Sequence, residues 1–153
     1  MELLERKIPP VALFIIFIVV MVRFDGALES FAAVLPFPWT VLACSVLVSG
    51  FIGLAGVNEF RKAKTTVNPV KVDSASSVVD TGIFAYSRNP MYLALLILLF
   101  GIGYWQQNMV CLLLPIGFVF YMNRFQILPE ERALEKLFGE QYLAYKQRVR
   151  RWL

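Results

Sequence analysis

Histidine is absent from this chain of 153 residues, and cysteine occurs only twice. Cys44 and Cys111 both lie inside apolar stretches, far apart in the sequence. Without imidazole, and with only two isolated thiols, neither a disulfide framework nor a zinc or haem site can be built. We therefore expect no metal in the functional site.

Charge is also scarce, at 17% of the residues, and it lies mostly outside long apolar blocks. The longest such block has no charged residue from Phe31 to Val57. A hydrophobic content of 58% exceeds that of an ordinary soluble domain of this length. The net charge of +4 comes from basic residues that flank the apolar blocks, which indicates a lipid bilayer and not a nucleic acid as the partner. The chain is predicted to be one membrane-embedded domain, residues 1–153.

Apolar blocks predict four transmembrane helices, at about 8–23, 38–58, 90–106 and 108–125. The first block is short against the roughly 20 residues that a spanning helix needs, but Lys7 and Arg23 can reach the two interfaces. It also has the length of a signal peptide core. Because Arg23 stands where a cleavage pattern would follow, we favour a retained first span.

The segment 129–151 repeats apolar residues at helical spacing, with charge on the opposite face. This pattern predicts one amphipathic helix on the membrane surface or over the mouth of the bundle. Its basic end, 148–151, is interpreted as an anchor for anionic lipid head groups. The predicted fold is an all-α membrane protein with four transmembrane helices and a C-terminal amphipathic helix over the cytoplasmic mouth.

The distribution of positive charge predicts the orientation. Lysine and arginine gather in the segment 59–88 and in the C-terminal tail, whereas the turn near Gln106 carries no charge. Positively charged loops stay in the cytoplasm, so both termini and the 59–88 segment are expected there. We expect a multi-pass integral membrane protein, placed in a bacterial inner membrane.

Polar residues stand at the mouths of two predicted spans. The run Arg88-Asn89-Pro90-Met91-Tyr92 opens the third, and Glu130-Glu131 follows the fourth. Such groups are costly at a membrane unless they have partners, so they indicate a functional site. Structural explanations stay open: a charge-rule arginine, an Asn-Pro helix start, an interfacial tyrosine, and carboxylates that favour the positive end of a helix dipole.

These elements in this order resemble the isoprenylcysteine carboxyl methyltransferase and phospholipid methyltransferase family. The resemblance covers about residues 60–152 and also includes Thr65-Thr66-Val67-Asn68-Pro69, the run from Val78 to Phe84, and Phe138-Gly139. It implies an integral-membrane enzyme that transfers a methyl group from S-adenosyl-L-methionine to a lipid or a lipid-modified acceptor.

The resemblance also implies residue roles. The catalytic residues would be Arg88 and Glu131. The cofactor-binding residues would be Val78, Val79, Gly82, Phe84, Asn89, Pro90, Tyr92, Glu130 and Glu131. Many family members have histidine where this chain has Asn89, and an amide cannot serve as a base near neutral pH.

The two glutamates are expected to differ. On a helical projection, Glu131 lies within about 35° of the centre of the tail's apolar face, and Glu130 lies nearly twice as far from it. Glu131 should therefore be buried against the cofactor's ammonium group or Arg88, and Glu130 should face the helix dipole and solvent.

Two other functions stay open. Sterol reductases, which use NADPH, share a similar Arg-x-Pro-x-Tyr element, and a non-catalytic membrane scaffold would explain the apolar composition alone. The sequence leaves open whether the acceptor is a carboxylate, an amine or a thiol, and what the oligomeric state is.

Overall fold

The computed structural model describes residues 5–27, 29–63 and 77–153, and over these ranges the chain is helical. No strand occurs in these ranges, where one isolated bridge joins Ala32 and Asn108. The predicted all-α class is confirmed. The α-helices are α1 (Pro10–Ala27), α2 (Pro38–Lys62), α3 (Pro90–Trp105), α4 (Met109–Tyr121), α5 (Leu128–Phe138) and α6 (Glu140–Arg148). The described ranges also contain two 3₁₀ turns, η2 (Glu29–Phe31) and η4 (Gly82–Ala85), and a π-helix, η5 (Met122–Ile127).

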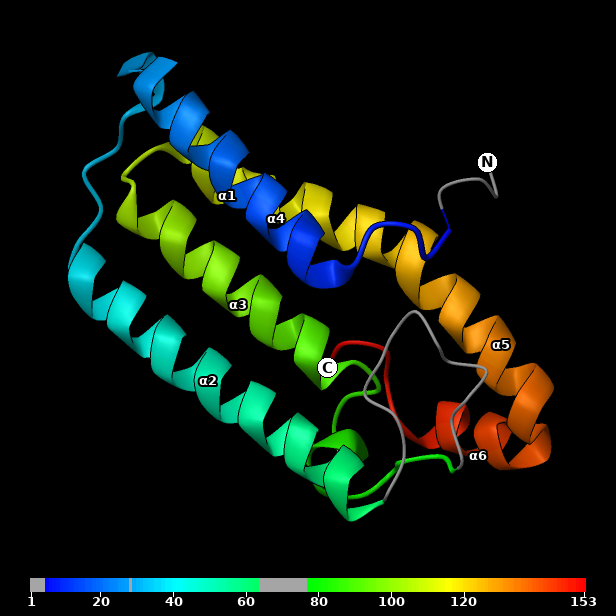
Figure 1. Cartoon of the computed structure of the whole chain (residues 1–153). Coiled ribbons are helices and arrows are strands. Elements are labelled where there is room, and N and C mark those ends of the chain that lie inside the picture. Colours follow the sequence, from blue (N-terminus) through cyan, green and yellow to red (C-terminus); the bar gives the residue numbers. More distant parts are fainter. Residues whose placement is uncertain (1–4, 28, 64–76) are drawn as a thin grey trace.

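Helices α1 to α4 lie side by side in the order α1, α4, α3, α2 (Figure 1). Phe118, Leu99 and Met21 are fully buried between them. Helices α3 and α4 form a tight hairpin, and Gly103 lets their backbones approach closely. A Cβ at this position would stand 2.5 Å from the carbonyl oxygen of Cys111. Asn108 caps the start of α4, where its side chain accepts a 3.0 Å hydrogen bond from the Val110 amide.

The outer surface of the bundle is apolar. Leu54, Leu47 and Phe120 are each more than 70% exposed, although all are large hydrophobic residues. Exposure of many large hydrophobic side chains indicates contact with lipid, where helices satisfy their backbone hydrogen bonds internally. Among the described residues, three helical segments are long and apolar enough to cross a membrane: Pro10–Ala27, Pro38–Lys62 and Met109–Phe138. Helix α3 is equally apolar but has 16 residues.

The fourth apolar block does not end where the sequence predicted. Helix α4 continues through the π-helix η5 into α5, so Pro129 lies inside one helical segment, Met109–Phe138. A proline normally loses a helical bond to the carbonyl four residues earlier, which here belongs to Phe125. The wider π turn accommodates the ring, and the Arg6 amide donates a 2.9 Å hydrogen bond to that carbonyl.

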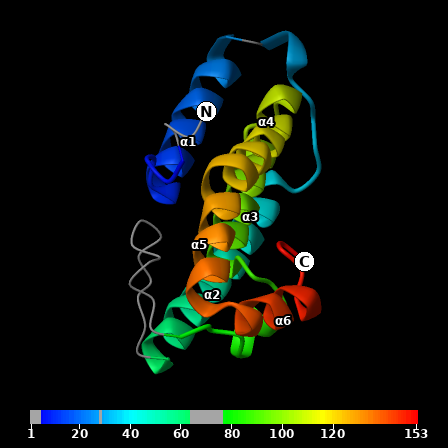
Figure 2. The same ribbon diagram turned by 90° about the vertical axis from the view of Figure 1, so that its right-hand side faces the viewer.

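The prediction of one amphipathic helix over 129–151 is wrong. Gly139 has a positive φ of 50° and separates α5 from α6, so the chain turns there. The turn brings α6 to the end of the bundle where α2 ends and α3 begins (Figures 1 and 2). Residues 149–152, called here the C-terminal strap, then run to the start of α3, where the Arg88 amide donates a 3.0 Å hydrogen bond to the Arg150 carbonyl.

Candidate active site

A buried ion pair lies where the start of α3 faces α5. Arg88 Nη2 donates to Glu131 Oε1 at 2.6 Å, and the side chains are only 8% and 4% exposed. Burial strengthens the attraction but also demands that each charge be fully paired. The helical projection predicted that Glu131 is buried, and Arg88 is one of the two partners expected for it.

Arg88 is also bonded to the backbone of the C-terminal region. Its Nη1 donates to the carbonyl oxygens of Lys146, at 3.2 Å, and Val149, at 2.5 Å. Its Nε is buried and has no hydrogen-bond partner among the described residues. A buried N–H without a partner is unusual in a folded protein.

A second guanidinium group completes the pairing of Glu131. Arg151 Nε lies 3.1 Å from Oε1, and its Nη2 lies 2.7 Å from Oε2. The hydrogen bond to Glu131 raises the pKa of Arg151 above its usual value. The sequence interpretation missed this residue and treated the basic end as a lipid anchor. No local pattern separates Arg151 from its neighbours, because the contact depends on the turn at Gly139.

Asn89 occupies the N-cap position of α3, but its side chain makes no capping hydrogen bond. Its Nδ2 instead donates to the Arg151 carbonyl at 2.9 Å, while its own amide donates to the Ser87 hydroxyl at 3.1 Å. The structural explanation of Asn89 as a side-chain cap is therefore wrong. Pro90 does stand in the first turn of α3, fully buried, as expected of a helix-starting proline.

Glu130 lies beside this cluster, in a neutral polar pocket. The Tyr92 hydroxyl donates to Glu130 Oε1 at 2.7 Å, and the side-chain amide of Gln126 donates to the same oxygen. The expectation that Glu130 faces solvent and a helix terminus is wrong, because the residue is 9% exposed and α5 has no separate beginning. Gln126, on the π-helix, was not singled out from the sequence.

Three residues that were expected to bind the cofactor, Val78, Val79 and Phe84, lie at the same end of the bundle. Val79 and Phe84 are buried, and Val78 packs against the cluster of Tyr142, Tyr145 and Val149. The Tyr145 hydroxyl donates a 2.8 Å hydrogen bond to the Phe84 carbonyl. Burial raises the pKa of Tyr145 well above its usual value, so this phenol keeps its proton and remains a donor.

The local structure explains why residue 82 is a glycine. Its φ is 57°, and a Cβ there would stand 2.6 Å from the carboxyl carbon of Glu59. That carboxylate accepts from the Thr81 hydroxyl at 2.9 Å and from Lys62 at 2.7 Å. Glycine is favoured here, because the positive φ strains other residues and a Cβ would displace the Glu59 side chain. The Thr65-Thr66-Val67-Asn68-Pro69 element lies outside the described residues.

Within the described part of the chain, no group of three or more His, Cys, Asp or Glu residues is placed to hold a metal ion. The site is made of two carboxylates, two guanidinium groups, two side-chain amides and a phenol at one end of an apolar helical bundle. These features define a helical membrane protein with a buried charged site.

The chain belongs to the phospholipid methyltransferase family, whose sequence pattern matches residues 38–141. This range contains Arg88, Asn89 and both glutamates, whereas Arg151 lies beyond it. The family expected from the sequence is confirmed.

The chain is also similar to two individual proteins, of which one has a named activity. The chain is 28% identical over 118 residues to a protein-S-isoprenylcysteine O-methyltransferase of Saccharomyces cerevisiae, over 72% of this chain but only 46% of the yeast protein. It is 48% identical over 63 residues to an uncharacterised protein of Haemophilus influenzae, over 41% of this chain and the whole of that protein. No solved structure matches the chain. Family and relative together support a membrane methyltransferase.

Proposed function

We propose that this protein transfers a methyl group from S-adenosyl-L-methionine to a lipid or lipid-modified acceptor at the cytoplasmic face of the membrane. The observation that carries the proposal is the buried Glu131, held by Arg88 at the mouth of an apolar bundle. A family of methyltransferases and a relative that acts on isoprenylcysteine support it. Nothing in the described residues favours the reductase or the scaffold.

The residues at this end of the bundle fit such a methyl donor. Glu131 would pair with its ammonium group, and the unpartnered Nε of Arg88 would donate to its carboxylate. Val78 and Phe84 would offer apolar and aromatic surface to its adenosine part. The cofactor supplies a methyl group already activated on a sulfonium.

Methyl transfer from a sulfonium therefore needs little acid or base catalysis by the protein. Its residues would hold donor and acceptor in line and exclude water. Asn89 can orient a group through its hydrogen bonds but cannot accept a proton. This suits an acceptor that arrives deprotonated, such as a carboxylate.

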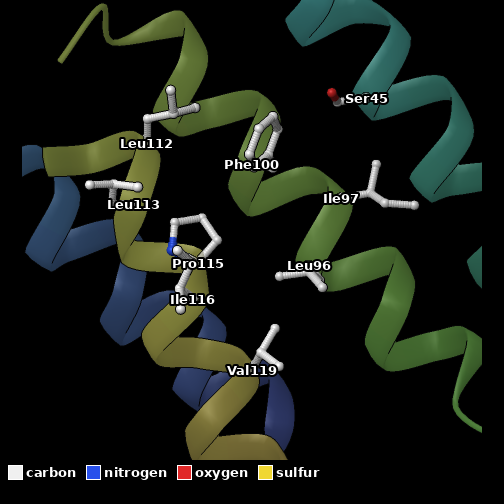
Figure 3. Close-up of a pocket in the computed structure, with 9 residues that line it drawn as sticks. All are labelled: Ser45, Leu96, Ile97, Phe100, Leu112, Leu113, Pro115, Ile116 and Val119. Atoms are coloured by element: carbon white, nitrogen blue, oxygen red, sulfur yellow. The ribbon is translucent and has the colours of Figure 1, made fainter. Parts of the chain in front are cut away.

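An apolar groove supports a lipid acceptor. It has a volume of about 600 Å³ and lies between α3 and α4, with Ser45 of α2 at its edge (Figure 3). Leu96, at one end of the groove, is one helical turn along α3 from Tyr92. An acyl or isoprenyl chain in this groove would direct its head group toward the charged site.

The donor is tested with detergent-solubilised protein. S-adenosyl-L-methionine is expected to raise the melting temperature, and NADPH is not, because a ligand stabilises the folded state that binds it. Membranes incubated with methyl-labelled donor should then yield labelled lipid or lipidated protein. A shift with NADPH alone would sink the proposal.

Four spans are proposed, with α3 as the short one. Its 16 residues are about 24 Å long, and a bilayer can thin locally around a helix of this length. The end that carries the site would face the cytoplasm, following the charge bias.

Accessibility labelling tests this orientation. In a background without native cysteines, Arg61→Cys at the end of α2 should be labelled from the cytoplasm, and Met109→Cys at the hairpin from the other side. Labelling of both from one face would refute the four-span arrangement.

A further inference from the structure

The C-terminal strap engages the charged site at several points. Asn89 Nδ2 donates to the Arg151 carbonyl, and the Arg88 amide donates to the Arg150 carbonyl. Trp152 Nε1 donates to Asn123 Oδ1 on the π-helix at 3.1 Å. These bonds hold the strap across the start of α3, and they place the Arg151 guanidinium on Glu131.

Cations outnumber the negative charge of Glu131. Arg88 and Arg151 both donate to it, and Lys146 Nζ lies 3.9 Å from Oε2. Lys146 has a second partner, Glu135, at 2.5 Å, but neither arginine makes another ion pair with a described residue. A further ammonium group at Glu131 would add a like charge within a few ångströms of two guanidinium groups, which is costly in a buried site.

The two arginines are not held equally. The Arg88 side chain is 8% exposed and is fixed by two backbone carbonyls besides Glu131. The Arg151 side chain is 31% exposed, and among the residues that the structure describes its guanidinium bonds only to Glu131. Arg151 is therefore the cation that can leave, together with the strap that carries it.

We propose that Arg151 is a built-in competitor for the ammonium group of the methyl donor at Glu131, so that donor binding requires the strap to release it. This inference rests on the proposed function. It adds to the site a residue that lies outside the family match, and it gives the C-terminal strap the role of a latch on the donor site.

The test is the affinity of the solubilised protein for two probes, measured by calorimetric titration. One probe is S-adenosylhomocysteine, and the other is its deaminated analogue, which keeps the carboxylate but has no ammonium group. Arg151→Gln is expected to bind S-adenosylhomocysteine about tenfold more tightly than the wild type, the scale of one charge-assisted hydrogen bond. Its affinity for the deaminated analogue should stay unchanged, because that probe does not compete for Glu131.

Arg150→Gln is the matched control, since it removes the same charge from the neighbouring exposed position and should change neither affinity. Trp152→Phe removes the strap's bond to Asn123 without changing charge, and it should give a smaller gain for S-adenosylhomocysteine only. This second variant keeps the test valid if Arg151→Gln does not fold.

Other outcomes would overturn the latch. Weaker binding of both probes by Arg151→Gln would mean that Arg151 holds the donor's carboxylate, and equal affinities would mean that it plays no part in binding. If neither the wild type nor any variant binds either probe, the proposed methyl donor itself is wrong, which is a different result from a latch that fails in a protein that binds it.

Discussion

Replacing Arg88 with alanine is expected to lower the free energy of unfolding by about 3 kcal/mol, the typical cost of removing one partner of a buried ion pair. The change would leave the Val149 and Lys146 carbonyls without their donor and Glu131 with Arg151 alone. Methyl transfer should be lost as well, because the strap, α5 and α3 meet at this side chain. Thermal and denaturant unfolding in detergent, with activity on the same sample, measure both effects.

Arg148→Ala is the control for this experiment. Arg148 pairs with Asp80 at 2.9 Å, but its side chain is 65% exposed, and exposed pairs contribute little to stability. It should unfold and react almost as the wild type does. An Arg88→Ala protein as stable as Arg148→Ala would show that the buried pair does not hold the site together.

Glu131→Gln and Glu130→Gln should differ sharply in their affinity for S-adenosylhomocysteine. Glu131 is the counter-charge of two guanidinium groups, and glutamine would remove the charge that we expect to bind the donor's ammonium. A loss of tenfold or more is expected, on the scale of a charge-assisted hydrogen bond.

Glu130→Gln should lose much less, because both of its hydrogen bonds reach one oxygen, which a glutamine carbonyl can reproduce. Calorimetric titration of both variants gives the comparison, with melting temperatures recorded to separate binding from folding. A larger loss of affinity for Glu130→Gln would indicate that the donor's ammonium group binds at Glu130, beside Tyr92 and Gln126.

The sequence predicted the helices well, because helix formation depends mainly on residues that are close together in the sequence. Apolar blocks of helical length lie where α1, α2, α3 and α4 are found, and Pro90 begins α3 as its position indicated. The helical projection also predicted that Glu131 is buried, since the direction of a residue on a regular helix follows from its position along that helix.

The projection failed for Glu130 because the helix does not begin at Pro129. A proline after an apolar block usually marks a helix start, and here the π-helix and the Arg6 amide allow the helix to pass through it. A local sequence pattern around Pro129 predicts neither the π-helix nor the hydrogen bond from Arg6, which is distant in the sequence.

By itself, then, the amino-acid sequence determined that this protein is an all-helical, membrane-type methyltransferase family member, and that Glu131 lies on the buried face of its helix. Only the tertiary structure decided that the tail turns at Gly139, that Asn89 bonds to the strap and does not cap α3, and that Arg151 lies on Glu131. Helical periodicity is set by residues three or four apart, whereas these contacts join residues 20 to 62 apart and follow from how the chain is folded back on itself.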